Sequence, residues 1–246
     1  MIKIGVADYG LNVWYGGMYD YPQRLAMLKE LGYDGLERLE AGNQAEAIEI
    51  AADARKMGMD FGTCLAPGKM QTIRFSAALG KRYIWTVSAQ GPMEVFCRHV
   101  NAQIDTAECY GLKVGLHNHL GSVAESSQEV ETFLEKCPRA GLILDTGHMA
   151  GAGGDPVYFA DRYFDRIVAV HVKDFVYKDR NADAWYDRLR FCELGAGEMG
   201  DQNRKVIETL LAKGYDGWIY VEHDTHLRDP RIDLKISRDY IRACGI

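Results

Sequence analysis

Six of the seven histidines in this 246-residue chain lie at or just beyond the carboxyl ends of stretches that have the composition of β-strands. They are His117, His119, His148, His171, His223 and His226. Carboxylates stand at similar points, because Asp145 and Glu222 each end an apolar run and Glu125 follows another. Imidazole and carboxylate groups together suit divalent cations such as Mn²⁺, Co²⁺, Fe²⁺, Zn²⁺ or Mg²⁺. These residue types at these points predict metal chemistry.

The stretch Gly141-Leu-Ile-Leu-Asp-Thr-Gly-His148 joins an apolar run directly to a carboxylate. An apolar run this short is typical of a strand buried on both faces. The charge of Asp145 at its end needs a cation or a hydrogen-bond partner, because burying an unpaired charge costs free energy. Glycines at 147, 151, 153 and 154 make the following loop thin enough for a ligand to approach the backbone. Asp145 is therefore either a metal ligand or an aspartate that caps a turn.

Strand-like and helix-like stretches alternate along the whole chain, which predicts parallel strands joined by crossover helices. Eight such units in this length indicate one closed (β/α)₈ TIM barrel, a single α/β domain over residues 1–246. A long polar segment, 175–200, is expected to be a loop. The expected strands are 2–8, 33–40, 59–66, 83–88, 113–119, 141–145, 167–174 and 217–222. The expected helices are 20–31, 44–57, 70–80, 92–110, 126–137, 155–164, 202–213 and 229–243.

The carboxyl ends of the strands share one face of such a barrel, and that face carries the active site. The barrel therefore gathers the histidines and carboxylates at one rim. His171 and Lys173 are two residues apart on one expected strand, so both point into the barrel mouth. Lys173 either holds a substrate oxygen or forms an ordinary ion pair with Asp174 or Glu222.

The composition excludes several classes of protein. Lys and Arg total 29 against 35 Asp and Glu, and the net charge of −6 argues against a nucleic-acid partner. No run of 18 apolar residues predicts a membrane span, and the first residues lead straight into a strand without a signal peptide. Six scattered cysteines without a CxxC motif suit reduced thiols and a cytoplasmic location. Both a monomer and a homo-oligomer are compatible with this composition.

Four stretches in the C-terminal half carry a family resemblance: Val114-Gly-Leu-His-Asn-His119, Leu144-Asp-Thr-Gly-His148, His171-Val-Lys-Asp174 and Gly217-Trp-Ile-Tyr-Val-Glu222. With them the chain resembles the xylose-isomerase-like TIM-barrel superfamily of sugar isomerases, epimerases and dehydratases, also known as the sugar phosphate isomerase/epimerase family. The order of the Asp-Thr-Gly-His, Gly-Gly-Asp-Pro and His-x-Lys-Asp motifs looks closest to the inosose dehydratase branch. The segment Phe191-Cys-Glu-Leu-Gly-Ala-Gly197 also looks like that branch.

The resemblance implies one divalent metal ion held by four side chains, one from each of strands five to eight. Carried over, three of them are Asp145, His171 and Glu222. The fourth is His117 or Glu125, because many members have a glutamate at the position of His117. In epimerases of the family that glutamate is also an acid/base group, so its absence favours a one-base dehydration or isomerisation. Mn²⁺ or Co²⁺ is expected first, and Zn²⁺, Fe²⁺ and Mg²⁺ also fit.

Such a site supports proton removal next to the carbonyl of a keto-sugar or keto-polyol, through an enediolate. Glu222 is the expected base, and His119 or His148 would protonate a departing hydroxide or return the proton. The candidates for substrate binding are Lys173, Arg190, Glu37 in the family's Gly-x-Asp-Gly-x-Glu position, and Trp14 and Tyr15 as stacking rings. The expected substrate is a small sugar or a cyclic polyol.

Two other functions remain as alternatives. An endonuclease IV-like DNA-repair enzyme would use the same barrel, but it needs more metal ligands and a basic groove. A non-catalytic sugar-binding barrel would keep the fold without needing all the ligands.

Overall fold

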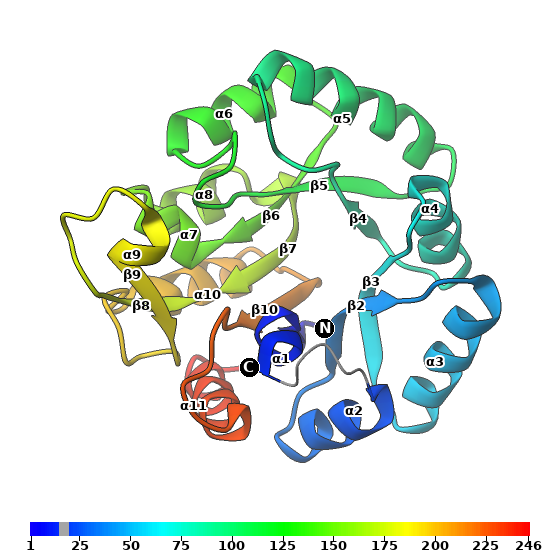
Figure 1. Cartoon of the computed structure of the whole chain (residues 1–246), viewed down its shortest axis with the longest axis horizontal. Coiled ribbons are helices and arrows are strands. Elements are labelled where there is room, and N and C mark those ends of the chain that lie inside the picture. Colours follow the sequence, from blue (N-terminus) through cyan, green and yellow to red (C-terminus); the bar gives the residue numbers. More distant parts are fainter. Residues whose placement is uncertain (15–19) are drawn as a thin grey trace.

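The computed structural model describes residues 1–14 and 20–246. Eight parallel strands form a nearly closed barrel, and the crossover helices pack around its outside (Figure 1). The fold is the expected single-domain TIM barrel. The strands, in sheet order, are β3 (Asp60–Leu65), β2 (Gly35–Glu40), β1 (Lys3–Ala7), β10 (Trp218–Glu222), β7 (Ile167–Val172), β6 (Gly141–Asp145), β5 (Lys113–His117) and β4 (Tyr83–Trp85).

Seven of the outer helices lie close to their expected ranges, because each begins after a turn or a capping residue and ends where the apolar spacing stops. Asp20, Asn43 and Ser126, for example, each accept a backbone N–H of the helix that follows. These helices are α2 (Tyr21–Glu30), α3 (Gln44–Lys56), α4 (Lys69–Ala78), α5 (Met93–Glu108), α6 (Ser127–Lys136), α10 (Gln202–Ala212) and α11 (Pro230–Ala243). The eighth expected helix is shorter: α8 (Pro156–Arg162) precedes a 3₁₀ turn, Phe164–Arg166. No helix in the described part of the chain is long and apolar enough to cross a membrane.

The register of the strands places the polar residues near their carboxyl ends at a similar level along the barrel axis. Asp145 on β6 is the register partner of His171 on β7. Glu222 on β10 is the partner of Ala7 on β1. Asp145 and Glu222 end β6 and β10, and His171 is the second-to-last residue of β7, so all three lie at the same rim of the barrel.

The interior of the barrel is filled below that level by a small cluster around Tyr83 and Tyr220. Tyr220 fits because its register partner on β1 and a residue of β3 are both glycine. A Cβ at Gly62 would lie 1.6 Å from the hydroxyl oxygen of Tyr220, and one at Gly5 would lie 2.7 Å from its ring. The barrel is thus a packed core with its polar groups at the open end.

Strands β3 and β4 are the two edges of the sheet, and no backbone ladder joins them within residues 1–14 and 20–246. Side chains connect them instead. The hydroxyl of Thr63 donates to the carbonyl of Tyr83 at 2.7 Å, and Lys81 donates to the carbonyl of Phe61 at 2.7 Å. β4 is also shorter than the expected strand 83–88.

The segment 175–200 was expected to be a loop, and this is wrong in part. It contains an antiparallel pair, β8 (Asp174–Tyr177) and β9 (Leu189–Cys192), and the short helix α9 (Trp185–Arg188) between them. Apolar residues of the pair, including Phe175 and Phe191, pack in a separate cluster beside the barrel mouth.

Two further short helices stand where loops were expected. They are α1 (Tyr9–Trp14), after β1, and α7 (Thr146–Gly151), directly after β6. The segment of α7 was expected to be a loop because it contains Gly147 and Gly151, and glycine has a low helix propensity. The side chain of Asp145 caps this helix, which compensates for them.

Candidate metal centre

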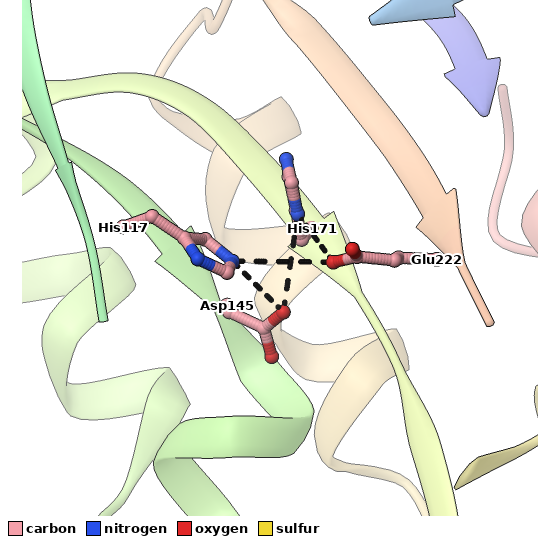
Figure 2. Close-up of side chains that lie close together, drawn as sticks. All are labelled: His117, Asp145, His171 and Glu222. Carbon is pink, nitrogen blue, oxygen red and sulfur yellow. Dashed lines mark hydrogen bonds and ion pairs between the residues drawn. The ribbon is translucent and has the colours of Figure 1, made fainter. Parts of the chain in front are cut away.

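Four buried side chains converge at the carboxyl ends of β5, β6, β7 and β10 (Figure 2). Each offers one donor atom, and these atoms all lie within 4.8 Å of one another. The four residues are His117, Asp145, His171 and Glu222. Two are fully enclosed, and the most accessible, His117, is only 8% exposed. We call this group the four-residue cluster.

The distances inside the cluster fit a single cation. His117 Nε2 lies 3.3 Å from Asp145 Oδ2 and 3.9 Å from Glu222 Oε2. His171 Nδ1 lies 2.7 Å from Glu222 Oε2 and 3.9 Å from Asp145 Oδ2. Donor atoms that share an ion at about 2.0–2.2 Å are themselves separated by roughly 3–4 Å. The cluster could therefore hold a metal ion with modest movement of the side chains.

The two oxygens of Asp145 have different partners. Oδ1 accepts the backbone N–H of His148 at 2.7 Å and so caps α7, while Oδ2 faces the cluster. Asn118 holds the backbone of Asp145 from both sides, with hydrogen bonds of 2.9 Å and 3.0 Å. The cap expected as the alternative to a metal ligand is confirmed, and it leaves the other oxygen available to a cation.

His171 lies between two carboxylates. Its Nδ1 faces Glu222, and its Nε2 lies 3.1 Å from Glu37 Oε1, although that second contact lacks hydrogen-bond geometry. Burial disfavours the charged ring, but Glu37 and Glu222 together raise the pKa of His171 to about 10. The two carboxylates around this ring therefore favour a positive charge at this place. A cation bound in the cluster would supply that charge instead of a proton on the ring.

Glu37 lies behind His171 in the barrel interior and is 1% exposed. Trp85 Nε1 and the hydroxyl of Tyr83 donate to the same oxygen, Oε1, at 2.9 Å and 3.0 Å. Burial raises the pKa of Glu37, but His171 and Arg38 outweigh it and the net shift is downward. Glu37 is therefore an ionised carboxylate that faces the outer nitrogen of His171.

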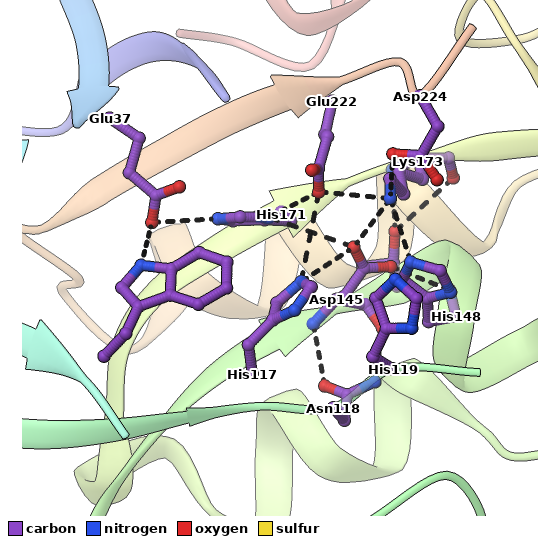
Figure 3. Close-up of polar contacts among 12 residues, drawn as sticks. Glu37, His117, Asn118, His119, Asp145, His148, His171, Lys173, Glu222 and Asp224 are labelled. Atoms are coloured by element: carbon purple, nitrogen blue, oxygen red, sulfur yellow. Dashed lines mark hydrogen bonds and ion pairs between the residues drawn. The ribbon is translucent and has the colours of Figure 1, made fainter. Parts of the chain in front are cut away.

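Lys173 is fully buried beside the cluster (Figure 3). Its Nζ lies 3.1 Å from Glu222 Oε2, 3.0 Å from Asp224 Oδ1 and 3.6 Å from Asp145 Oδ2. Burial works against the ammonium, but these carboxylates raise the pKa of Lys173 above its usual value. The expected ion pair with Glu222 is present. Asp174 instead accepts backbone N–H groups from the segment 195–199.

Two histidine rings in close contact, tilted by 38°, lie next to Lys173. The ring centroids of His119 and His148 are 3.8 Å apart, and Lys173 Nζ lies 3.0 Å from His148 Nε2. Burial and the charge of Lys173 hold the pKa of His148 well below its usual range, so this ring is neutral. His119 Nδ1 lies 2.6 Å from the carbonyl of Leu120, and its ring is only partly buried. Trp185 of α9 meets both rings edge-on.

Glu125, the alternative to His117, lies in the loop after β5. Its Oε2 accepts the backbone N–H of Gly121 at 2.8 Å. It is not among the residues whose donor atoms meet in the cluster, whereas His117 is. The geometry therefore places His117, and not Glu125, in the four-residue cluster.

The remaining candidates lie elsewhere. Arg190 is on β9, and its Nη1 lies 3.4 Å from the carbonyl of Phe191. Trp14 ends α1 with 43% of its surface exposed, and Tyr15 lies outside the described residues. No described contact brings Arg190 or Trp14 to the cluster, so their roles in substrate binding stay predictions.

The family is decided by a comparison of the whole chain. The family model for the xylose isomerase-like TIM barrel matches residues 25–244. The chain belongs to this family. An inosose dehydratase from Mesomycoplasma hyopneumoniae is 33% identical over an alignment that covers 98% of this chain and 96% of that protein. One from Lactiplantibacillus plantarum is 32% identical, but that alignment covers 59% of this chain and about half, 52%, of the relative.

Solved structures agree on the xylose isomerase-like fold. A probable 3-DHS dehydratase from Bacillus anthracis superposes with a TM-score of 0.76, at 13% identity, over 98% of each chain. A 3-keto-D-glucoside 4-epimerase from E. coli gives a TM-score of 0.71, at 15% identity, over 99% of this chain and 100% of that one. At these identities the likeness concerns the fold alone.

Three residues of this xylose isomerase-like site were not singled out from the sequence. Asp224 follows Glu222 by two positions, as Lys173 follows His171, so strand alternation could have found it. Asn118 lies between His117 and His119 and could have been suspected. Trp85 packs its ring 4.6 Å from that of His117, and nothing in its local sequence signals this contact.

Proposed function

We propose that this chain is a divalent-metal-dependent enzyme that removes a proton next to the carbonyl of a keto-sugar or keto-polyol. An inosose-dehydratase-like lyase is the first candidate reaction, and a sugar isomerase or epimerase is the second. The observation that carries the proposal is the convergence of the four-residue cluster at the catalytic face of the barrel. The relatives named inosose dehydratase support the substrate class. A cytoplasmic location and the absence of a nucleic-acid partner remain predictions.

The four ligands would be His117, Asp145, His171 and Glu222. Two imidazoles and two carboxylates suit Mn²⁺ or Co²⁺, and Zn²⁺, Fe²⁺ and Mg²⁺ are the alternatives. When bound, the ion would supply Lewis-acid stabilisation of negative charge on a substrate oxygen. The chain supports this by holding Asp145 through the α7 cap and Asn118, so that Oδ2 is already directed at the site.

Glu222 is the proposed base. Burial raises its pKa, but Lys173 and His171 outweigh this and hold the pKa of Glu222 well below its usual range. The carboxylate is therefore ionised at neutral pH and free to take a proton. Its contacts with His171 and Lys173 both use Oε2, so Oε1 is the oxygen that would receive the proton.

His119 is the better placed of the two candidate acids. The Nε2 of His148 is within hydrogen-bond reach of the Lys173 ammonium, and His148 is fully buried. His119 is partly buried and its Nδ1 lies at the Leu120 carbonyl, so the doubly protonated ring would give its Nε2 proton to a departing hydroxide or return it to carbon. Lys173 would hold a substrate oxygen and keep Glu222 ionised.

Glu37 acts, in this proposal, on His171 rather than on substrate hydroxyls. A metal-bound histidine usually gives its other N–H to a carboxylate or a carbonyl, which fixes the tautomer. Glu37 Oε1 lies on the Nε2 side of His171, so the Nδ1 lone pair is left for the ion. Glu37 is thus proposed as a positioning residue.

The test combines metal analysis with proton exchange. The purified protein should contain a divalent metal, lose activity with chelator and regain it with Mn²⁺ or Co²⁺. Keto-inositols and ketoses incubated in deuterated water should gain deuterium next to the carbonyl or lose water, as followed by NMR. Asp145→Asn should abolish both the bound metal and the reaction seen by NMR. Full turnover in excess chelator without bound metal contradicts the proposal.

A further inference from the structure

A second group of metal-ligating side chains lies on the other side of β10, toward α11. His223, His226 and Asp233 are each less than 8% exposed, and one donor atom from each lies within 4.8 Å of the others. His223 directly follows Glu222, and successive side chains of an extended strand point to opposite faces. Glu222 therefore faces the barrel mouth, while His223 faces the first turn of α11, which Figure 1 shows beside β10 and α1.

Both imidazoles approach one carboxylate oxygen. His226 Nδ1 lies 3.0 Å from Asp233 Oδ2, and His223 Nδ1 lies 3.9 Å from the same oxygen. The two rings are stacked, with centroids 4.5 Å apart and planes at 24°. Two nitrogens and one oxygen thus gather at one point inside the protein.

His223 lacks the partners that a buried imidazole needs. Neither ring nitrogen has a hydrogen-bond partner among the described residues, and the side chain is 4% exposed. The backbone of Cys192 lies near the ring, but the geometry is not that of a hydrogen bond. Buried polar atoms are nearly always satisfied, so an unpartnered ring directed at a carboxylate indicates an additional ligand.

The two oxygens of Asp233 have different partners, and Oδ2 is hydrogen-bonded to His226 Nδ1 at 3.0 Å, a bond that a bound cation would replace. Its Oδ1 accepts Arg228 Nε at 2.6 Å, and Arg228 also binds Glu193 at 2.8 Å. Helix α1 closes over the group, because a Cβ at Gly10 would lie 1.6 Å from the carbonyl oxygen of His223. The arrangement parallels Asp145, where one oxygen holds the local structure and the other faces imidazoles.

We propose that His223, His226 and Asp233 bind a second divalent cation, of the Zn²⁺ or Co²⁺ class, through two imidazole nitrogens and Oδ2. Imidazole with one carboxylate is a common donor set for these ions. The ion ties the segment after β10 to α11. That segment includes Asp224, which contacts Lys173, so the second ion also steadies one side of the four-residue cluster.

The experiment counts metal ions. Metal-free protein is titrated with Co²⁺, and binding is followed by the absorption of the bound ion. The number of ions bound per chain is then measured by elemental analysis after dialysis. Wild-type protein should bind two equivalents, and His226→Gln and Asp145→Asn should each bind one. The combined variant should bind none. His99→Gln, at an exposed histidine on α5, is the matched control and should still bind two.

Each pattern of results has one meaning. One equivalent in wild type that is lost in Asp145→Asn and kept in His226→Gln overturns the second site and leaves the proposed metal centre intact. One equivalent that is lost only in His226→Gln supports the second site and removes the first. If His226→Gln does not fold, ¹¹³Cd NMR of Asp145→Asn decides, because one resonance from the second site is expected in that variant and none overturns the inference.

Discussion

Glu37 Oε1 and His171 Nε2 face each other inside the barrel, 3.1 Å apart. Glu37→Gln should weaken metal binding by roughly 10–100-fold, because the outer partner of a ligating histidine sets its tautomer and basicity. The fall in kcat should exceed any rise in KM for the substrate. Metal affinity is measured by competition with a chromogenic chelator, and rates are measured at saturating metal. A variant that raises only the KM would return Glu37 to the role of a substrate contact.

Tyr83→Phe is the matched comparison for that experiment. It removes one of the hydrogen bonds to Glu37 but leaves the carboxylate in place. Its metal affinity should therefore stay much closer to that of the wild type. Equal losses in Tyr83→Phe and Glu37→Gln would indicate a general packing defect instead.

Glu222→Gln should keep the fold and lose about 10²–10⁴-fold in turnover, as expected when a general base is removed. Because Glu222 is also a proposed ligand, metal content is measured in the same samples. The decisive signal is solvent deuterium exchange at saturating metal, which should vanish. Near-normal exchange would exclude Glu222 as the base.

Lys173→Met should change the pH dependence of kcat/KM. Lys173 lowers the pKa of Glu222, so its removal raises that pKa and the base is ionised only at higher pH. The acidic limb of the profile should therefore move to higher pH. Lys178→Met, at an exposed lysine beyond β8, is the control and should leave the limb unchanged. A limb that stays in place in Lys173→Met contradicts this electrostatic role.

The choice between His117 and Glu125 can be tested with a pair of variants. His117→Ala should lower metal affinity strongly, because it removes a donor atom from the four-residue cluster. Glu125→Ala removes only a hydrogen bond to the backbone of Gly121, so metal affinity should remain close to wild type. Isothermal titration with Mn²⁺ compares the two. A larger loss of Mn²⁺ affinity in Glu125→Ala than in His117→Ala would make Glu125 the ligand.

The sequence was sufficient to predict the barrel and the meeting of Asp145, His171 and Glu222. Each ends or nearly ends a strand, and parallel strands bring their carboxyl ends to one rim. His117 was left open beside Glu125, because the reach of a loop side chain cannot be judged from spacing alone.

Two features depended on tertiary structure. The β8–β9 pair was hidden by the polar residues between its strands, and its apolar residues pack only because Leu120 and Met199 lie opposite them. Glu37 was expected to contact substrate hydroxyls, and that role stays a prediction. The structure also places its Oε1 3.1 Å from His171 Nε2, a contact between β2 and β7 that no local pattern encodes.

In the described part of the chain no backbone ladder joins β3 and β4, so these two edge strands are connected there by the hydrogen bonds of Thr63 and Lys81. Trp85 belongs to one of those edge strands and holds Glu37. Loss of the contacts between β3 and β4 would therefore disturb the carboxylate behind His171. A circular permutant with its new termini between β3 and β4 would therefore separate two strands that share no backbone hydrogen bonds.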